Sequence, residues 1–169
     1  MNNILEVRGL RKSYATFSLN DVSFNVPSGY IMGFIGPNGA GKTTTIKLIL
    51  GIIKRDAGTV NIFGREASLA LNEDIGVVMD APMYVDEWTL AEVERAISPF
   101  YKQWDSRLYA DYIKRFELDA KKKVKELSRG MKVKLQIAAA LSHNAQILIL
   151  DEPTKALLQC EFLNCFTIA

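Results

Sequence analysis

The residues best suited to chemistry are 36–43, which read GPNGAGKT. They fit the spacing G-x-x-x-x-G-K-[ST], in which glycines let backbone N–H groups surround phosphate oxygens without a Cβ in the way. Lys42 would supply a full charge for the β- and γ-phosphates, and the Thr43 hydroxyl would bind Mg²⁺. The segment predicts a loop for ATP and Mg²⁺; an ordinary glycine-rich turn is the alternative. The expected ATP contacts are Gly36, Pro37, Asn38, Gly39, Ala40, Gly41, Lys42, Thr43 and Thr44.

A second polar group follows the apolar run ILIL at 147–150, where Asp151 and Glu152 are adjacent. Open α/β sheets bind ligands beyond the carboxyl ends of their strands. Asp151 could hold Mg²⁺ through its water shell, and Glu152 could orient and deprotonate an attacking water. An Asp-Glu pair that ends a strand is common by itself. Downstream of a phosphate-binding loop it predicts a P-loop NTPase in which Glu152 and Lys42 are catalytic.

A third motif, ELSRGMK at residues 126–132, precedes an expected helix. A helix cap would explain its Leu-Ser pair equally well. This motif lies between the phosphate-binding loop and the segment DEPT at residues 151–154. In that position it resembles the LSGGQ signature of ABC ATPases, with Ser128 and Gly130 matching. The resemblance to ABC transporter ATP-binding proteins covers residues 3–154. It includes LNDVSFNVPSG, which precedes the expected strand before the phosphate-binding loop.

The family resemblance implies roles for three further residues. Ser128 and the backbone at Gly130 would contact the γ-phosphate bound to a second subunit, and the dipole of the signature helix would point at the same phosphate. Tyr14 falls where the family has an aromatic residue that stacks on adenine. A half-buried strand tyrosine would also explain Tyr14.

The resemblance also implies an activity and partners. ATP hydrolysis would drive transport, with two ATP-binding subunits, identical or different, enclosing two ATP molecules head to tail. The partner would be a separate transmembrane permease, so the chain would lie in the cytoplasm at the inner face of the membrane. The motifs look closest to ATPases of bacterial ABC-2-type exporters. A soluble ABC protein of translation or repair is the other class considered, but neither a second ATPase domain nor a long coiled-coil insert is visible in the sequence.

Three family positions carry unusual residues. Asp80 stands where the family has a glutamine that touches Mg²⁺ and the attacking water; a carboxylate could still approach Mg²⁺ as a shorter, charged ligand. Arg129 replaces a signature glycine, and Met131 replaces the signature glutamine. Arg129 could add a charge-assisted contact to phosphate or could simply face solvent.

The resemblance stops at Thr154, and residues 155–169 read as an atypical tail. The family continues with a Leu-Asp loop and a strand that ends in a switch histidine. The chain's one histidine, His143, precedes Asp151 and cannot fill that role. The sequence therefore favours a truncated or frameshifted ATP-binding domain with poor hydrolysis. A nucleotide-binding fragment without turnover is the alternative function.

The pattern of apolar residues predicts the elements that position these groups. Strands are expected at 4–8, 19–26, 30–35, 59–63, 74–79 and 147–150, turns at 27–29 and 56–58, and helices at 43–53 and 130–143. The strands at 30–35, 74–79 and 147–150 should be fully buried, because they are nearly all apolar. Residues 86–118 predict a helical insert.

Within that insert, Thr89 and Glu92 should form a capping box, and Pro99 should end the first helix. Asp105 should cap a second helix that buries Leu108, Tyr112, Ile113 and Phe116. The basic run at 121–125 is expected to be a solvated turn.

The fold class is therefore α/β: a P-loop NTPase core with a parallel sheet, an antiparallel β portion and a helical subdomain. Residues 1–169 form one incomplete domain, with the nucleotide-binding core at 1–85 and 145–154 and the helical subdomain at 86–144.

Composition agrees with a globular protein. The 169 residues are 49% apolar and 24% charged, with a net charge of +2, so nothing demands nucleic acid or an acidic membrane surface. No apolar run approaches the roughly 20 residues that span a bilayer. Both cysteines, Cys160 and Cys165, lie near the end of the sequence, which suits a reducing cytosol better than a disulfide framework.

Overall fold

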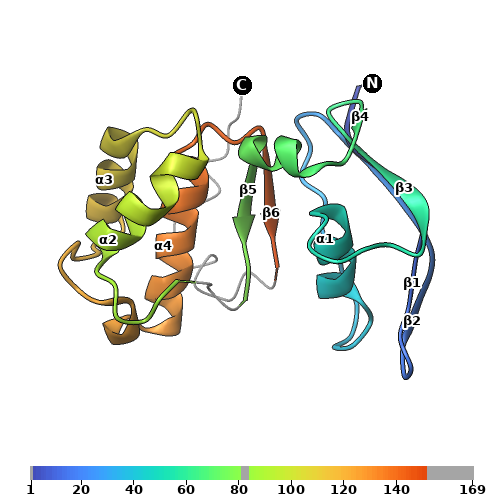
Figure 1. Cartoon of the computed structure of the whole chain (residues 1–169), viewed down its shortest axis with the longest axis horizontal. Coiled ribbons are helices and arrows are strands. Elements are labelled where there is room, and N and C mark those ends of the chain that lie inside the picture. The colour runs from blue at the N-terminus through green and yellow to red at the C-terminus, as the bar shows by residue number, and fades with distance from the viewer. Residues whose placement is uncertain (1, 81–83, 152–169) are drawn as a thin grey trace. The chain divides into compact units, whose positions relative to one another are not determined.

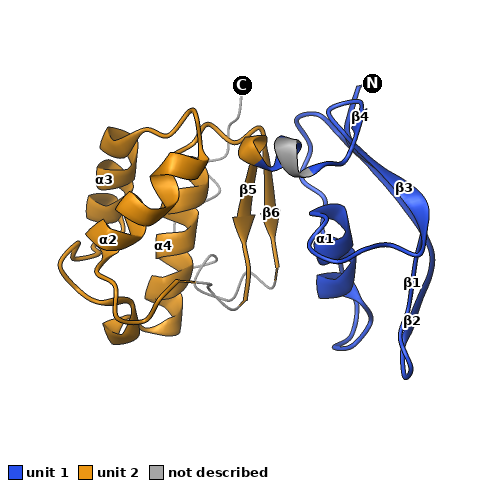
Figure 2. Ribbon diagram, in the orientation of Figure 1, with its two compact units in different colours: residues 1–72, 168–169 blue, residues 73–167 orange. Residues whose placement is uncertain are grey.

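The computed structural model describes residues 2–80 and 84–151. Contacts divide these residues into two compact units (Figure 2). The first unit ends at Asn72, and the second begins at Glu73. Each unit is described by itself below.

The first unit is an antiparallel sheet with one α-helix beside it (Figure 1). Its strands are β1 (Asn3–Ser13), β2 (Ser18–Pro27), β3 (Ala57–Ile62) and β4 (Arg65–Glu66), in the order β2-β1-β3-β4. The helix α1 spans Lys42–Ile49, and the 3-10 helix η1 (Leu69–Asp74) runs into the second unit. Buried side chains from both central strands form the core of the sheet: Leu5, Val7, Leu10, Val60 and Ile62. The expected antiparallel portion is confirmed.

A glycine fixes the pairing of β3 with β1. Gly58 has a φ of +90°, and a Cβ added there would lie 2.4 Å from the carbonyl oxygen of Gly9. Only a residue without a side chain allows the two backbones to approach so closely. The prediction of a turn at 56–58 was wrong in part, because β3 already begins at Ala57.

The strand expected at residues 30–35 is absent. These residues follow the turn at Ser28 and Gly29 as irregular chain, and Ile35 is 98% exposed. An apolar run can form a strand only where another strand accepts and donates its backbone hydrogen bonds. Neither described sheet pairs with this segment, which explains why the prediction of a buried strand was wrong.

The second unit combines a small parallel sheet with three α-helices. Its elements are β5 (Ile75–Val78), α2 (Leu90–Ile97), α3 (Ser106–Arg115), α4 (Arg129–Leu141) and β6 (Ile147–Leu150), with short 3-10 helices at Ser98–Phe100 and Val124–Glu126. The helix α4 packs against β5 and also contacts α3 (Figure 1). The parallel pairing of β5 with β6 and the helical insert are both confirmed. The residues of β6 are only partly buried, contrary to expectation, because β5 is the only described strand beside it.

Helix ends in the second unit follow the sequence signals. The Thr89 hydroxyl accepts from the Glu92 N–H, and the Glu92 carboxylate accepts from the Thr89 N–H, so the capping box is confirmed. The Asp105 carboxylate caps α3, because it accepts hydrogen bonds from the N–H groups of Arg107 and Leu108. Pro99 lies in the 3-10 turn that ends α2.

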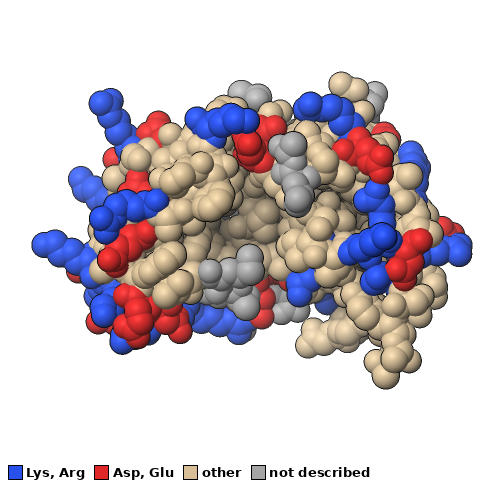
Figure 3. All heavy atoms as spheres, viewed as in Figure 1, with Lys and Arg blue, Asp and Glu red and all other residues tan. Residues whose placement is uncertain are grey.

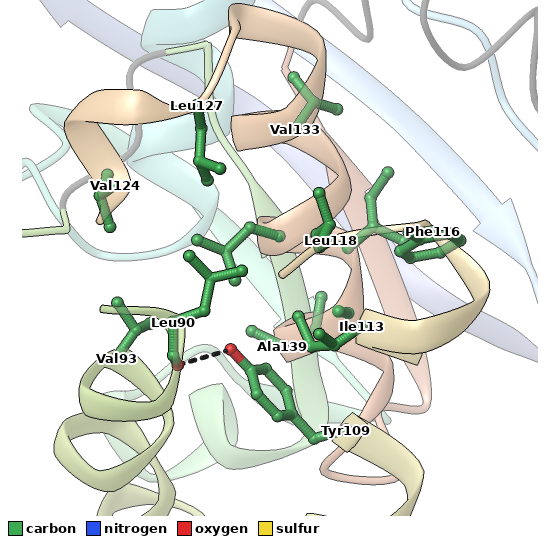
Figure 4. Packing of buried hydrophobic residues seen from close by; sticks show 14 of the residues in the cluster. Leu90, Val93, Tyr109, Ile113, Phe116, Leu118, Val124, Leu127, Val133 and Ala139 are labelled. Carbon is green, nitrogen blue, oxygen red and sulfur yellow. Dashed lines mark hydrogen bonds between the residues drawn. The ribbon is translucent and has the colours of Figure 1, made fainter. Parts of the chain in front are cut away.

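The buried face of α3 differs from the expected one by one position. Ile113 and Phe116 are buried and Tyr112 partly so, but Leu108 is 36% exposed and Tyr109 is buried instead. Figure 4 shows the reason, because the Tyr109 hydroxyl points at α2 and donates to the Leu90 carbonyl at 3.1 Å. A tyrosine can be buried at low cost where its hydroxyl finds a partner.

The basic run at 121–125 is held by an acidic side chain rather than simply solvated. Glu87 forms ion pairs with Lys123 at 3.3 Å and Lys125 at 2.9 Å. The hydrogen bond from Lys125, followed by that from Lys123, lowers the pKa of Glu87 below its usual range. Val124 between the two lysines is buried. Basic and acidic side chains also lie close to one another around the margins of the face shown in Figure 3.

Candidate nucleotide-binding site

The predicted phosphate-binding loop turns directly into α1. Residues 38 and 39 form a turn, which the Ala40 N–H closes by donating to the Pro37 carbonyl at 3.2 Å. Gly41 is the N-cap residue of α1 and has a φ of +93°, in the left-handed region. That conformation costs a residue with a Cβ about 1–2 kcal/mol. Gly41 thus directs the chain into a helix whose first N–H groups carry partial positive charge.

Lys42 places its charge inside this loop. Its Nζ donates to the carbonyl oxygens of Gly36 at 2.8 Å and Pro37 at 3.0 Å. Behind it, the Thr45 hydroxyl donates to the Gly41 carbonyl at 2.9 Å and fixes the first turn of α1. Thr43 and Thr44 lie in the same turn and are partly buried. The loop therefore collects one ammonium group, the N–H groups at the start of a helix and threonine hydroxyls within a few residues.

The hairpin that joins β1 to β2 contacts the end of this loop. A Cβ added at Gly41 would lie 2.9 Å from both the Phe17 ring and the Leu19 side chain. The Tyr14 ring stacks on Phe17 with 6.4 Å between ring centroids, and the Nζ of Lys12 is 5.7 Å from the centre of the Tyr14 ring. Tyr14 is exposed and lies in the turn after β1, so it is not a half-buried strand residue. An aromatic ring is thus presented beside the phosphate-binding loop.

The second unit carries the acidic residues, at the carboxyl ends of its two strands. Val78 pairs with Leu150, and the Asp151 N–H donates to the Val78 carbonyl at 2.8 Å. Asp151 is 3% exposed, whereas Asp80 is exposed two residues beyond β5. The parallel register therefore brings both carboxylates to one edge of the sheet. Glu152 and Thr154 lie outside the described residues.

Gln136 holds this edge and was missed in the sequence. The amide side chain projects from α4, accepts from the Met79 N–H and donates to the Met79 carbonyl, each at 3.0 Å. It is buried, and it fixes the backbone residue directly before Asp80. The available signal was a glutamine between Leu135 and Ile137 in a mostly apolar stretch of the expected helix, because a buried amide needs hydrogen-bond partners.

The signature segment forms the start of α4. The Ser128 hydroxyl accepts from the Met131 N–H at 3.3 Å, so the helix-cap interpretation of Leu-Ser holds for this serine. Gly130 is the second residue of the helix. The Arg129 side chain is exposed and forms an ion pair with Asp80, and its expected contact with phosphate stays a prediction. Two of the three residues that depart from the family pattern, Asp80 and Arg129, are therefore partners of each other.

A cleft of about 370 Å³ lies along this ion pair. It is lined by Asp80, Leu127, Arg129, Lys132, Val133 and Gln136. On its rim, Lys132 also pairs with Asp86 at 3.3 Å. Among residues 2–80 and 84–151, no three His, Cys, Asp or Glu side chains cluster as a metal site. A site that relied on one or two carboxylates, water and phosphate oxygens would still suit Mg²⁺.

Sequence comparison connects this geometry to a known family. The family model described as ABC transporter matches residues 19–155, which include the phosphate-binding loop, the signature segment and Asp151. The chain belongs to the ABC transporter family. The fold class predicted from the sequence agrees, because solved ATP-binding subunits of ABC transporters have this fold.

Two curated relatives show how much of an ABC ATP-binding protein the chain represents. It is 32% identical over 157 residues to the lantibiotic transport ATP-binding protein SrtF of Streptococcus pyogenes, covering 91% of this chain and 68% of SrtF. It is 36% identical over 164 residues to the bacitracin transport ATP-binding protein BcrA of Bacillus licheniformis, covering 93% of this chain but 53% of BcrA. The chain thus spans between about half and two thirds of these relatives.

Two solved structures resemble the ABC protein described here. An ATP-binding subunit of an ABC transporter superposes with a TM-score of 0.78 at 30% identity, covering 90% of this chain and 68% of the other. An ABC transporter ATP-binding protein from Pyrococcus furiosus gives 0.74 at 29% identity, covering 88% of this chain and 75% of the other. The described residues contain no helix long and apolar enough to cross a bilayer.

The structure brings the expected site residues together in two sets. The first unit contains Tyr14, the loop 36–42 and Thr43, and the second contains Asp80, Ser128, Gly130 and Asp151. In this ABC protein the candidate phosphate-binding loop therefore lies in the first compact unit, and the acidic groups and signature residues lie in the second.

Proposed function

We propose that the chain binds Mg²⁺-ATP as the energy-converting subunit of an exporter. The observation that carries the proposal is the loop at 36–43, with Lys42 folded into it and α1 behind it. On nucleotide binding, the Lys42 ammonium would exchange the Gly36 and Pro37 carbonyls for phosphate oxygens. Tyr14 would stack on the adenine ring, which is worth about 1 kcal/mol.

Substitution of Lys42 tests this proposal. Lys42→Ala should weaken ATP binding at least about tenfold, or about 1.4 kcal/mol, because it removes the only full positive charge in the loop. Lys47→Ala, in the last turn of α1, is the matched control and should leave the affinity unchanged. Titration calorimetry with Mg²⁺-ATP measures both. Equal affinities of the Lys42 variant and the parent chain would refute the assignment.

The metal and the hydrolytic water would be handled by the acidic residues. Mg²⁺ prefers oxygen ligands, so the Thr43 hydroxyl and the Asp151 carboxylate fit it. Asp80 would first have to leave Arg129. Glu152 would orient and deprotonate the attacking water. When bound, Mg²⁺ would neutralise developing charge on the phosphates.

Phosphate release tests hydrolysis, with Glu152→Gln as the blank. Turnover of about one per second or more would be ordinary for an enzyme of this kind. Release equal to the blank, together with tight ATP binding, would instead support a nucleotide-binding protein without turnover.

Two ATP-binding subunits would enclose two ATP molecules, with Ser128 and Gly130 of one subunit facing the γ-phosphate bound to the other.

The partner would be a membrane permease, docked near residues 84–88. This stretch exposes Val85 and Trp88 around Asp86, which offers apolar surface beside ion pairs. SrtF and BcrA are both named as transport ATP-binding proteins. A crosslinker placed at Asp86 should therefore capture a membrane protein. Capture of soluble proteins alone would contradict a transporter role.

A further inference from the structure

Residues 31–35 of the first unit form an apolar segment whose backbone is unpaired. Within the described part of the chain, no backbone N–H or carbonyl of this segment makes a hydrogen bond to another residue. The side chains of the segment are exposed as well, and that of Ile31 is 83% exposed. An apolar segment with free N–H and carbonyl groups is a template to which another strand can add.

The segment is fixed at the end that leads into the phosphate-binding loop. Directly after it, the Gly36 carbonyl accepts from the Nζ of Lys42 at 2.8 Å. Within it, the Phe34 ring contacts the Phe24 ring of β2, with 5.4 Å between the ring centroids. These contacts hold the segment beside β2 and leave its backbone groups free. A template that is already held in place costs less conformational entropy when a strand binds to it.

The tail of the chain contains a segment that suits this template. Residues 162–168 read FLNCFTI, without a charged residue, glycine or proline. Phenylalanine, threonine and isoleucine favour strands, and seven residues in a strand extend about 23 Å, which is enough to cover residues 31–35. An uncharged apolar run of this kind promotes aggregation unless another strand covers it. The tail lies outside the described residues; the others outside them, 1 and 81–83, are too few for a strand.

We propose that residues 162–168 add as a strand to residues 31–35, through backbone hydrogen bonds and contacts between apolar side chains. Residues 152–161 connect this strand to Asp151, and such a connection spans up to about 36 Å when fully extended. A segment tethered by a short flexible connection has an effective concentration in the millimolar range. The chain's own tail is therefore favoured over the same segment of a second copy at micromolar protein concentration.

Amide hydrogen exchange of the full chain tests this proposal without any nucleotide, so the result does not depend on the function proposed above. The amides of residues 31–35 should exchange at least about tenfold more slowly than in an unstructured peptide, and dilution should not change their rates. The amides of β1 and β3 provide the folding check, because they should stay protected in every variant.

Proline substitutions in the tail show whether it supplies the protection. Successive N–H groups of a strand point to opposite edges, so Asn164→Pro or Cys165→Pro must remove a hydrogen bond to residues 31–35. At least one of these two variants should lose the protection of residues 31–35. Gln159→Pro lies outside the proposed strand and is the matched control, which should keep the protection.

Cys165 provides a second measurement, in a chain that also carries Cys160→Ser. Single cysteine substitutions at positions 31–35 should include one that forms a disulfide with Cys165 within the same chain, because facing residues of paired strands lie within disulfide distance. Glu66→Cys, in β4 at the opposite edge of the sheet from β2, is the control and should react far more slowly.

Three results would overturn the proposal. The first is free exchange of the amides of residues 31–35 in the parent chain. The second is protection that survives both Asn164→Pro and Cys165→Pro. The third is protection that appears only at high protein concentration, with Cys165 disulfides that join two chains, because this would assign the segment to a second copy.

Discussion

Gln136 offers the sharpest test of how the second unit positions Asp80. Its amide makes two 3.0 Å hydrogen bonds to the backbone of Met79. Gln136→Leu keeps the side-chain volume similar but leaves the Met79 N–H and carbonyl without the Gln136 amide, and each lost hydrogen bond costs about 1 kcal/mol net. Because Met79 is only partly buried, water can replace some of what is lost, so we expect about 1–3 kcal/mol of destabilisation.

Tryptophan fluorescence can follow this change in one unit alone. Both tryptophans of the chain, Trp88 and Trp104, lie in the second unit. For a unit of this size, about 1 kcal/mol corresponds to a shift of about 4–8 °C in the unfolding midpoint. Urea titration of the same signal yields the free energy of unfolding.

Two further variants decide the interpretation. Gln146→Leu is the control, since Gln146 is exposed, and it should change stability by less than about 0.5 kcal/mol. Gln136→Glu keeps one acceptor for the Met79 N–H but loses the donor, so its cost should be substantial as well. A Gln136→Leu chain as stable as the parent would refute the claim that this amide fixes the end of β5.

Three other predictions concern separate parts of the chain. Gly58→Ala should destabilise the first unit by more than about 2 kcal/mol, because its Cβ would meet the Gly9 carbonyl at 2.4 Å; circular dichroism during urea unfolding measures this. The free energy of unfolding should fall as the pH drops below about 6.5, because burial lowers the pKa of His143 in the folded chain and the unfolded chain therefore takes up the proton at a higher pH. His143→Gln should reduce this pH dependence, as measured by urea unfolding followed by fluorescence. Asp80 and Arg129 should show a coupling of about 0.2–1 kcal/mol in a double-mutant cycle, because both are exposed; urea unfolding at low and high salt should show the coupling shrink.

Each of these expectations can fail. A Gly58→Ala chain of parental stability would mean that β1 and β3 can move apart without cost. An unchanged pH slope in the His143 variant would assign that slope to other groups. Exchange of the charges at Asp80 and Arg129 should restore the pair, and a swap that behaves like the sum of its single variants would show that the two side chains do not interact.

Local signals in the sequence predicted local structure well. The Thr89 and Glu92 box, the Asp105 cap and the strand expected at 19–26 depend on neighbours within a few residues, and all three are confirmed. The phosphate-binding loop was located by its spacing for the same reason. Its expected contacts with ATP stay a prediction.

What could not be predicted depends on contacts between distant segments. Residues 30–35 look like a buried strand, but an apolar run does not reveal whether a partner strand exists. The buried face of α3 shifted because Tyr109 finds a carbonyl at Leu90, 19 residues earlier in the chain. The role of Gln136 rests on a partner 57 residues away in the sequence. Helical periodicity alone contains none of this information.

The ion pair between Asp80 and Arg129 has a consequence for how the chain can change over generations. Each residue looks like a defect when it is compared alone with the family pattern, yet each neutralises the charge of the other. A change at one position would leave an unmatched charge beside the cleft, so reversion to the common glutamine or glycine is easiest when both positions change together. Among close relatives we therefore expect the acid and the base to be inherited as a pair, and lost as a pair.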